Sequence, residues 1–206
     1  MKRKRSLNKE KRESILKAAI SEFYERGYES SSMDIVAKNA NVSKATIYNH
    51  FENKEELFFA ITDIFMNRFK KAFDFTYNKN KGIKEQLLDI AKKEISFLSY
   101  KENITLIQIV TAILIQKNEI GVKLLNQTCK DSEINIIMTK NFLEEAKKDG
   151  KLFFDDSEFV ARQFIGMIKS FAFYPQLYGA PLLQEKQKNE LIVKSVHMIL
   201  TLYKSN

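Results

Sequence analysis

The stretch from Ile15 to Leu57 carries several helix start and stop signals close together, and this feature most constrains the fold. A first helix is predicted from about Asn8 to Arg26, because its core-facing residues recur at helical spacing and Gly27 supplies a left-handed stop. That spacing is set by Ile15, Ala18, Ala19, Glu22 and Phe23. The stretch therefore predicts short helices around a small core.

Polar residues at regular intervals predict where the next helices of this stretch begin. Ser31 is expected to cap a second helix, with an acidic residue three positions on as in a capping box. Asn41 follows at a tight turn that should need a positive φ, which asparagine tolerates better than most residues. Ser43 is expected to cap a third helix over 44–50, and Asn53 a fourth. Three helix amino-termini with free N–H groups are three places where a phosphate can bind.

Positive charge is concentrated at the start of the chain. The whole sequence has a net charge of +8, and residues 1–17 hold eight Lys and Arg against two Glu. A basic arm of this kind favours polyanions. A solvated, disordered terminus is the alternative, but the position of the arm just before the short capped helices favours nucleic acid.

The linked motifs of residues 15–57 resemble the DNA-binding domain of the TetR family of transcriptional regulators. The resemblance rests on the Ile15–Phe23 spacing, Gly27-Tyr28, Ile35-Val36-Ala37, Val42-Ser43-Lys44, Ile47-Tyr48, His50-Phe51 and Lys54-Glu55-Glu56-Leu57. It covers about a quarter of the chain. The sequence departs from the family at Asn41, where glycine is usual in the turn, and at Ala45, where glycine is common.

The third helix is the expected recognition helix, and four of its residues are candidates for contacts with base edges. They are Lys44, Ala45, Thr46 and Asn49. Asn49 can pair bidentately with adenine, Lys44 can reach guanine or a phosphate, and the Ala45 methyl can touch a thymine methyl. Six further residues are candidates for phosphate contacts: Ser31, Ser32, Ser43, Tyr48, His50 and Lys54. For any single polar residue, the alternative is solvent exposure without a DNA contact.

The whole chain is expected to be all-α, because it has two prolines, six glycines and no strand-like alternation that we recognised. We expect a helix-turn-helix DNA-binding domain with its basic arm over residues 1–53, and a helical ligand-binding and dimerisation domain over residues 54–206. Further helices are predicted at about 54–77, 83–100, 103–117, 157–178 and 184–203, with a long helical segment over 121–148.

Glu94 is the most unusual residue after the recognition helix, because it falls near the middle of an apolar helical arc. A buried, unpaired carboxylate is costly, so Glu94 should be paired or neutralised. Two interpretations stay open: a structural partner such as Lys or Arg on another helix (or an error in the assumed helical phase), or an acid that faces a cationic or hydrogen-bonding effector. The candidate effector-binding residues are Phe65, Phe69, Glu94, Gln108, Thr111, Met138 and Phe142.

The last two predicted helices have broad apolar faces, which suggest more apolar area than one monomer covers. The resemblance to the TetR family implies that these helices form a four-helix bundle with a second subunit. It also implies a palindromic double-stranded DNA operator and release by a small-molecule effector.

Other classes of protein find little support in the sequence. The single cysteine, Cys129, fits a reducing cytoplasm, and we recognise neither a signal peptide nor an apolar run of about 20 residues that would cross a membrane. Catalytic residues, metal ligands and cofactor motifs are not apparent, so we do not expect an enzyme. The leading hypothesis is a homodimeric repressor; a DNA-bound adaptor that is controlled by a protein partner, without an effector, is the alternative.

Overall fold

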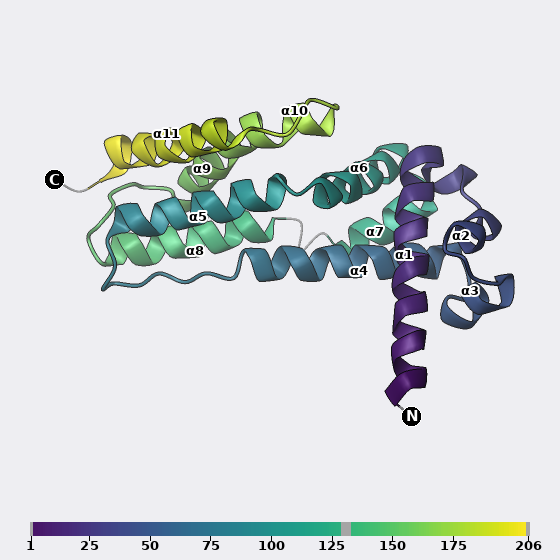
Figure 1. Ribbon diagram of the computed structural model, residues 1–206. Helices are drawn as coiled ribbons and strands as arrows, with labels where there is room; N and C mark the ends of the chain where they lie inside the picture. The colour runs from purple at the N-terminus through teal and green to yellow at the C-terminus, as the bar shows by residue number, and fades with distance from the viewer. Residues whose placement is uncertain (1, 129–132, 205–206) are drawn as a thin grey trace. The chain divides into compact units, whose positions relative to one another are not determined.

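The computed structural model describes residues 2–128 and 133–204, with side chains for residues 7–126 and 133–204. The described residues form helices, and their only other regular pairing is an isolated antiparallel bridge between Leu152 and Lys204 (Figure 1). The prediction of an all-α chain is therefore confirmed. The chain divides into two compact units, which we call the first unit (residues 2–67 and 105–128) and the second unit (residues 68–104 and 133–204).

The first unit contains the short helices that the sequence predicts. Helix α1 spans Lys2–Ser30, α2 Met33–Asn39 and α3 Lys44–His50. The first unit also contains most of α4 (Lys54–Ala72), most of α6 (Lys101–Gln116) and α7 (Glu119–Thr128). Its core is built by fully buried side chains from α1, α3, α4 and α7, among them Ile15, Ile47, Phe51, Leu57, Phe58 and Leu124.

Two predictions about the ends of these helices need correction. Helix α1 begins at Lys2 and not at Asn8, although Gly27 does interrupt it with a φ of 76° as expected. The cap of α2 is Ser32 and not Ser31, because the Ser32 hydroxyl accepts from the Asp34 N–H while the Ser31 hydroxyl turns back to the Tyr28 carbonyl. The predicted positive φ at Asn41 is confirmed, at 53°.

The second unit is a group of longer helices, α5 (Ile83–Leu98), α8 (Ile134–Lys148), α9 (Ser157–Ala172), α10 (Tyr174–Leu177) and α11 (Glu185–Tyr203). Helix α9 packs against α5, α8 and α11, and α11 also packs against α5 (Figure 1). The helix predicted over 157–178 is in fact two, α9 and α10, which meet at the non-helical Phe173. The segment predicted as helical over 121–148 likewise contains two helices, α7 and α8.

Helix α4 ends at Ala72, five residues before the predicted end at Tyr77. The chain then runs without a helix to Ile83, and its side chains alternate: Phe73, Phe75 and Tyr77 are buried or half-buried while Asp74, Thr76 and Asn78 are exposed. Phe73 stacks on Phe69 and Phe97, and Phe75 and Tyr77 stack on Phe142. This extended segment is held by aromatic contacts that alternate along it.

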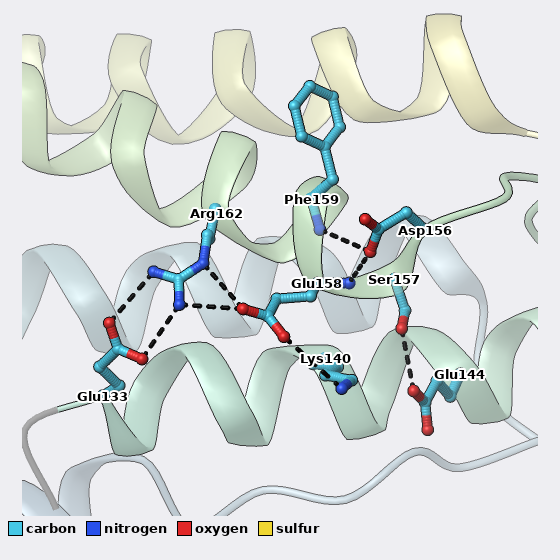
Figure 2. Close-up of polar contacts among 8 residues, drawn as sticks. All are labelled: Glu133, Lys140, Glu144, Asp156, Ser157, Glu158, Phe159 and Arg162. Carbon is cyan, nitrogen blue, oxygen red and sulfur yellow. Dashed lines mark hydrogen bonds and ion pairs between the residues drawn. The ribbon is translucent and has the colours of Figure 1, made fainter.

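Ion pairs join α8 to the start of α9 (Figure 2). The Arg162 guanidinium donates to both oxygens of Glu133, at 3.1 and 3.0 Å, and also to Glu158. Asp156 caps α9 by accepting from the backbone of Glu158 and Phe159. Figure 2 shows the Phe159 ring pointing away from these ion pairs, so the two sides of α9 differ in character.

Taken singly, none of the helices in the described ranges is long and apolar enough to cross a membrane, although α5 and α6 together reach the required length and composition.

Candidate functional site

Helix α3 is a short helix anchored on one side and open on the other. The Ser43 hydroxyl accepts from the Thr46 N–H at 3.1 Å, which fixes where the helix begins. Ile47 and Phe51 are buried in the core, as the sequence predicts. Lys44, Ala45 and Asn49 are exposed, whereas Thr46 is half-buried. The four base-edge candidates thus lie on one short helix, and three of them are exposed.

Lys44 already has a partner in the first unit. Its ammonium lies 2.8 Å from one oxygen of Asp34 and 2.9 Å from the other. The hydrogen bond to Asp34 raises the pKa of Lys44, so the side chain stays charged. Asp34 offsets part of that charge at the surface that would face DNA.

The serine candidates differ in their exposure. Ser43 is exposed and shares a hydrogen bond with the Thr46 hydroxyl, at 2.8 Å. Ser32 is half-buried at the start of α2, where it caps the helix. Ser31 is buried and donates to the Tyr28 carbonyl at 2.6 Å. The Ser31 hydroxyl is therefore no longer a phosphate candidate.

Lys54 is engaged inside the first unit. Its ammonium donates to the carbonyls of Tyr28, Glu29 and Ser31, at 2.7, 2.9 and 3.3 Å, and lies 4.6 Å from the centre of the Tyr28 ring. These acceptors use all three N–H groups of a lysine. They also give a charged donor to carbonyls at the end of α1, one of which, that of Tyr28, accepts from Ser31 as well. We now expect Lys54 to hold the start of α4 against the end of α1 instead of contacting a phosphate.

Tyr48 and His50 lie at the open side and at the edge of α3. Tyr48 is 43% exposed, and His50 is half-buried. Burial lowers the pKa of His50, and the neighbouring charges of Arg12 and Lys11 lower it further. His50 is therefore neutral at pH 7, where it can still donate one hydrogen bond to a phosphate.

Glu22 is a positioning residue that the sequence reasoning assigned only to the core. It is buried, and one carboxylate oxygen accepts from the Ser32 N–H at 3.3 Å while the other lies 3.4 Å from the Arg26 guanidinium. Glu22 thereby links α1 to the start of α2. An acid at a core-facing helical position was the signal that could have indicated this role.

Helix α7 and the residue just before it are tied to α4 and α1 within the first unit. The Lys123 ammonium pairs with both oxygens of Glu55, at 3.0 and 3.2 Å, in the first turn of α4. The Asn118 amide donates to Glu29 in α1 at 2.7 Å. These partners are 68 and 89 residues apart, so no local sequence pattern predicts the two contacts.

The predicted effector-binding residues are divided between the two units. Phe65, Gln108 and Thr111 belong to the first unit, and Phe69, Glu94, Met138 and Phe142 to the second. Within the second unit, Phe69 packs on Phe73 and Phe97, and Met138 is half-buried in α8. Phe142 lines a cavity of the second unit, together with Phe75.

Glu94 is buried as its helical phase predicts, with 1% of its surface exposed. The Asn135 amide donates to both carboxylate oxygens. Burial raises the pKa of Glu94 to about 6, although the Lys169 charge and the Asn135 hydrogen bonds oppose that rise. The hydrogen-bonding partner is thus a neutral amide, whereas Lys169 on α9 supplies a nearby positive charge of the kind that the structural interpretation named as an example. Whether Glu94 also faces an effector stays a prediction.

Two family models match this chain. A model for bacterial regulatory proteins of the tetR family matches residues 15–61. A model for the carboxy-terminal domain of AefR-like transcriptional repressors matches residues 85–205.

Relatives of known sequence and structure extend over nearly the whole chain. The uncharacterized HTH-type transcriptional regulator YhgD of Bacillus subtilis (strain 168) is 31% identical over 192 residues, which are 92% of this chain and 92% of that protein. A TetR family transcriptional regulator from Pseudomonas syringae pv. tomato str. DC3000 has a similar crystal structure, with a TM-score of 0.71, 31% identity and coverage of 95% of this chain and 97% of that one. The flavonoid-responsive regulator FrrA gives a TM-score of 0.71 at 25% identity, with coverage of 95% and 98%.

Proposed function

Because the chain belongs to the TetR family and is a DNA-binding transcriptional regulator, we propose that it is a repressor that binds a palindromic operator as a homodimer and is released by a small molecule. Residues 1–53 read the operator and residues 54–206 bind the effector and the second subunit. The proposal gains support from the second matching model, whose description names a repressor. Because bacterial operator DNA lies in the cytoplasm, we expect the protein to act there.

The open face of α3 is the observation that carries the proposal. Asn49 and Ala45 are exposed on a helix whose other side is buried through Ile47. A short helix of this kind enters the major groove, where Asn49 pairs with adenine and Ala45 touches a thymine methyl. Tyr48, Ser43 and the neutral His50 contact phosphates and fix the register. Two such helices in a dimer read half-sites about 34 Å apart.

Exposed apolar side chains on α9 and α11 support the dimer. Phe159 and Phe171 on α9, and Val193 and Leu202 on α11, are each more than half exposed although they are large and apolar. Two helices from each subunit can cover these residues in a four-helix bundle. A symmetric contact of this kind suits the two-fold symmetry of a palindromic operator.

Control by a small molecule follows from linkage between two conformations. An effector that binds the DNA-incompetent conformation more tightly than the competent one lowers operator affinity, at most by the ratio of its two affinities. The contacts of Lys123 with Glu55 and of Asn118 with Glu29 support a route from α6 and α7 to α4 and α1 of the first unit. The name of the flavonoid-responsive regulator FrrA supports small-molecule control in a similar protein. An adaptor without an effector is the second candidate.

The experiment that tests the proposal selects operator sites from random DNA and then measures affinities of variants. Asn49→Ala should lose about 1–3 kcal/mol of discrimination at one position in each half-site. Tyr48→Ala should weaken binding to all sequences alike. Asn67→Ala, an exposed asparagine in α4, is the matched control and should change neither. Equal operator affinity and base preference in all three variants would rule out α3 as the recognition helix.

The same preparations test effector control. Small molecules that raise the melting temperature are added to the operator complex, and release is measured. Release by at least one of them supports the repressor, whereas operator binding that no stabilising ligand changes favours the adaptor.

A further inference from the structure

Two neighbouring cavities of the second unit share Lys92 and Lys93 on α5. The first has a volume of about 400 Å³ and the second of about 580 Å³, both within the range of sites for small molecules. The first is lined by the extended segment and α5, with Phe142 from α8. The second is lined by the end of α4, α5 and the start of α6. We call the two cavities together the lysine groove.

The wall of the lysine groove is held in place by Gln86. Its side-chain oxygen accepts from the Asn78 N–H at 2.8 Å, and its amide donates to the carbonyls of Asn78 and Lys81, at 2.9 and 3.0 Å. Gln86 is itself buried, so the turn at 78–82 is fastened to α5 from inside. A preformed wall of this kind lowers the entropic cost of binding a ligand.

The floor of the groove is aromatic and apolar. Phe75 and Phe142 lie edge to face with ring centres 6.3 Å apart, and the buried Ile90 and Phe97 line the two cavities. The Lys93 ammonium lies 5.4 Å from the centre of the Phe75 ring and donates to the Asp74 carbonyl at 3.1 Å. A cation is thus held at the edge of an apolar surface.

The lysines that line the groove outnumber its acids. Lys71, Lys81, Lys92 and Lys93 line one or both cavities, and Asp89 is the one acid among the described residues that line them. Asp89 lies 3.9 Å from the Lys92 ammonium, and Glu85 lies 4.0 Å from that of Lys81; both are long for ion pairs. The local excess of positive charge therefore remains available to an anion.

A buried polar atom beside the second cavity also lacks a partner. Asn103 lines this cavity and is 4% exposed. Its amide donates to the Phe97 carbonyl at 2.9 Å, but its Oδ1 accepts no hydrogen bond from the residues that the structure describes. Buried acceptors are nearly always satisfied by protein, water or ligand.

We propose that the lysine groove binds a small organic anion, whose carboxylate or phosphate pairs with Lys92 and Lys93 while its apolar or aromatic body lies on Phe75 and Phe142. A hydroxyl or N–H group on such a ligand supplies a donor for Asn103. This site shares only Phe142 with the effector-binding residues that the sequence predicts. The claim that an anion in the groove acts as an effector rests on the proposed function. The claim that the groove binds an anion does not.

Calorimetric titration with matched probes tests the groove. The probes are naphthalene-2-carboxylate and 2-naphthyl phosphate, with neutral 2-naphthamide for comparison. Both anions should bind the full chain with a Kd of about 1 mM or tighter, and the amide should bind at least about tenfold more weakly. Lys92→Gln/Lys93→Gln should weaken binding of both anions by about tenfold or more. Stronger binding of the phosphate or of the carboxylate identifies the preferred source of the charge.

The matched control is Lys84→Gln/Lys186→Gln, which removes the same charge from exposed lysines outside both cavities. It should bind the anions as the unchanged protein does. Equal binding in both double variants, equal binding of the neutral amide, or no binding of either anion overturns the proposal. Operator affinity is also measured on the same preparations without any probe. If the unchanged protein does not bind operator DNA, that result counts against the proposed function and not against the groove.

Discussion

Asn135 donates to both carboxylate oxygens of Glu94, at 3.0 and 3.2 Å, in the interior of the second unit. The amide replaces the water that the carboxylate loses on burial, but it carries no charge to balance it. This explains why the pKa of Glu94 is raised to about 6 in spite of two good hydrogen bonds. The ionised form of Glu94 is therefore tolerated in the fold, at a cost.

The first prediction is a pH dependence of stability that belongs to Glu94. Because its pKa rises from 4.5 to about 6 on folding, the folded state binds more protons between these values. The contribution of Glu94 to the free energy of unfolding is therefore least favourable above about pH 6, and it improves as the pH falls toward 4.5. Relative to the unchanged protein, Glu94→Gln should gain about 1 kcal/mol in free energy of unfolding between about pH 5 and pH 7.5.

Urea titrations at several pH values measure this difference. Glu85→Gln, which removes an exposed acid from the same helix, is the control for loss of a carboxylate. The informative quantity is how the difference in free energy of unfolding changes with pH. Its absolute size also contains the altered hydrogen bonds of the new amide, which are present at every pH. A constant offset for Glu94→Gln would mean that Glu94 titrates normally.

The second prediction separates the two roles considered for Lys54. If its three carbonyl acceptors define its role, Lys54→Gln should lower the free energy of unfolding by about 1 kcal/mol, because exposed or partly buried carbonyls lose a charged donor. The salt dependence of DNA binding should stay the same, since no phosphate contact is removed. The salt dependence is the slope of the logarithm of operator affinity against the logarithm of salt concentration. If Lys54→Gln decreases the magnitude of this slope by about 1, Lys54 contacts a phosphate after all.

The third prediction concerns Asp34, whose carboxylate holds Lys44 at 2.8 Å. Asp34→Asn removes a negative charge beside the recognition helix and frees the Lys44 ammonium for DNA. Affinity for operator and random DNA should both rise, by about threefold to tenfold at low salt. Fluorescence anisotropy with the two DNAs measures the change, and Asp63→Asn in α4 serves as the control. An unchanged or lower affinity would place Lys44 away from the DNA.

Local signals in the sequence were sufficient for the turn and caps around α3. Asn41, Ser43 and Gly27 act through their own backbone or through neighbours within three residues, so their roles can be predicted without the fold. The contacts of Lys54 with Tyr28 and of Lys123 with Glu55 join residues 26 and 68 positions apart. Such partners depend on packing, which a single sequence does not reveal.

The end of α4 was misplaced for a different reason. Phe73 continues the helical spacing of Phe65 and Phe69, but it also begins the alternation with Phe75 and Tyr77. Both periods fit the same aromatic residues, and aromatic contacts with Phe97 and Phe142 decide in favour of the extended chain. The lysine groove depends on this extended segment, and the helical spacing therefore did not predict it.

The last prediction concerns the face of α9 and α11 that we assign to the second subunit. Phe171 is 58% exposed on α9, and Phe171→Glu places a charge where the proposed bundle buries a ring. Sedimentation should then show a monomer, and operator affinity should fall by about 100-fold or more, because the two half-sites are no longer bound by one linked unit. Phe153→Glu, at a phenylalanine that is 73% exposed and lies outside both helices, should leave the dimer and its affinity unchanged. A Phe171→Glu protein that remains a dimer would place the interface elsewhere, and the exposed residues of α9 and α11 would then need another partner.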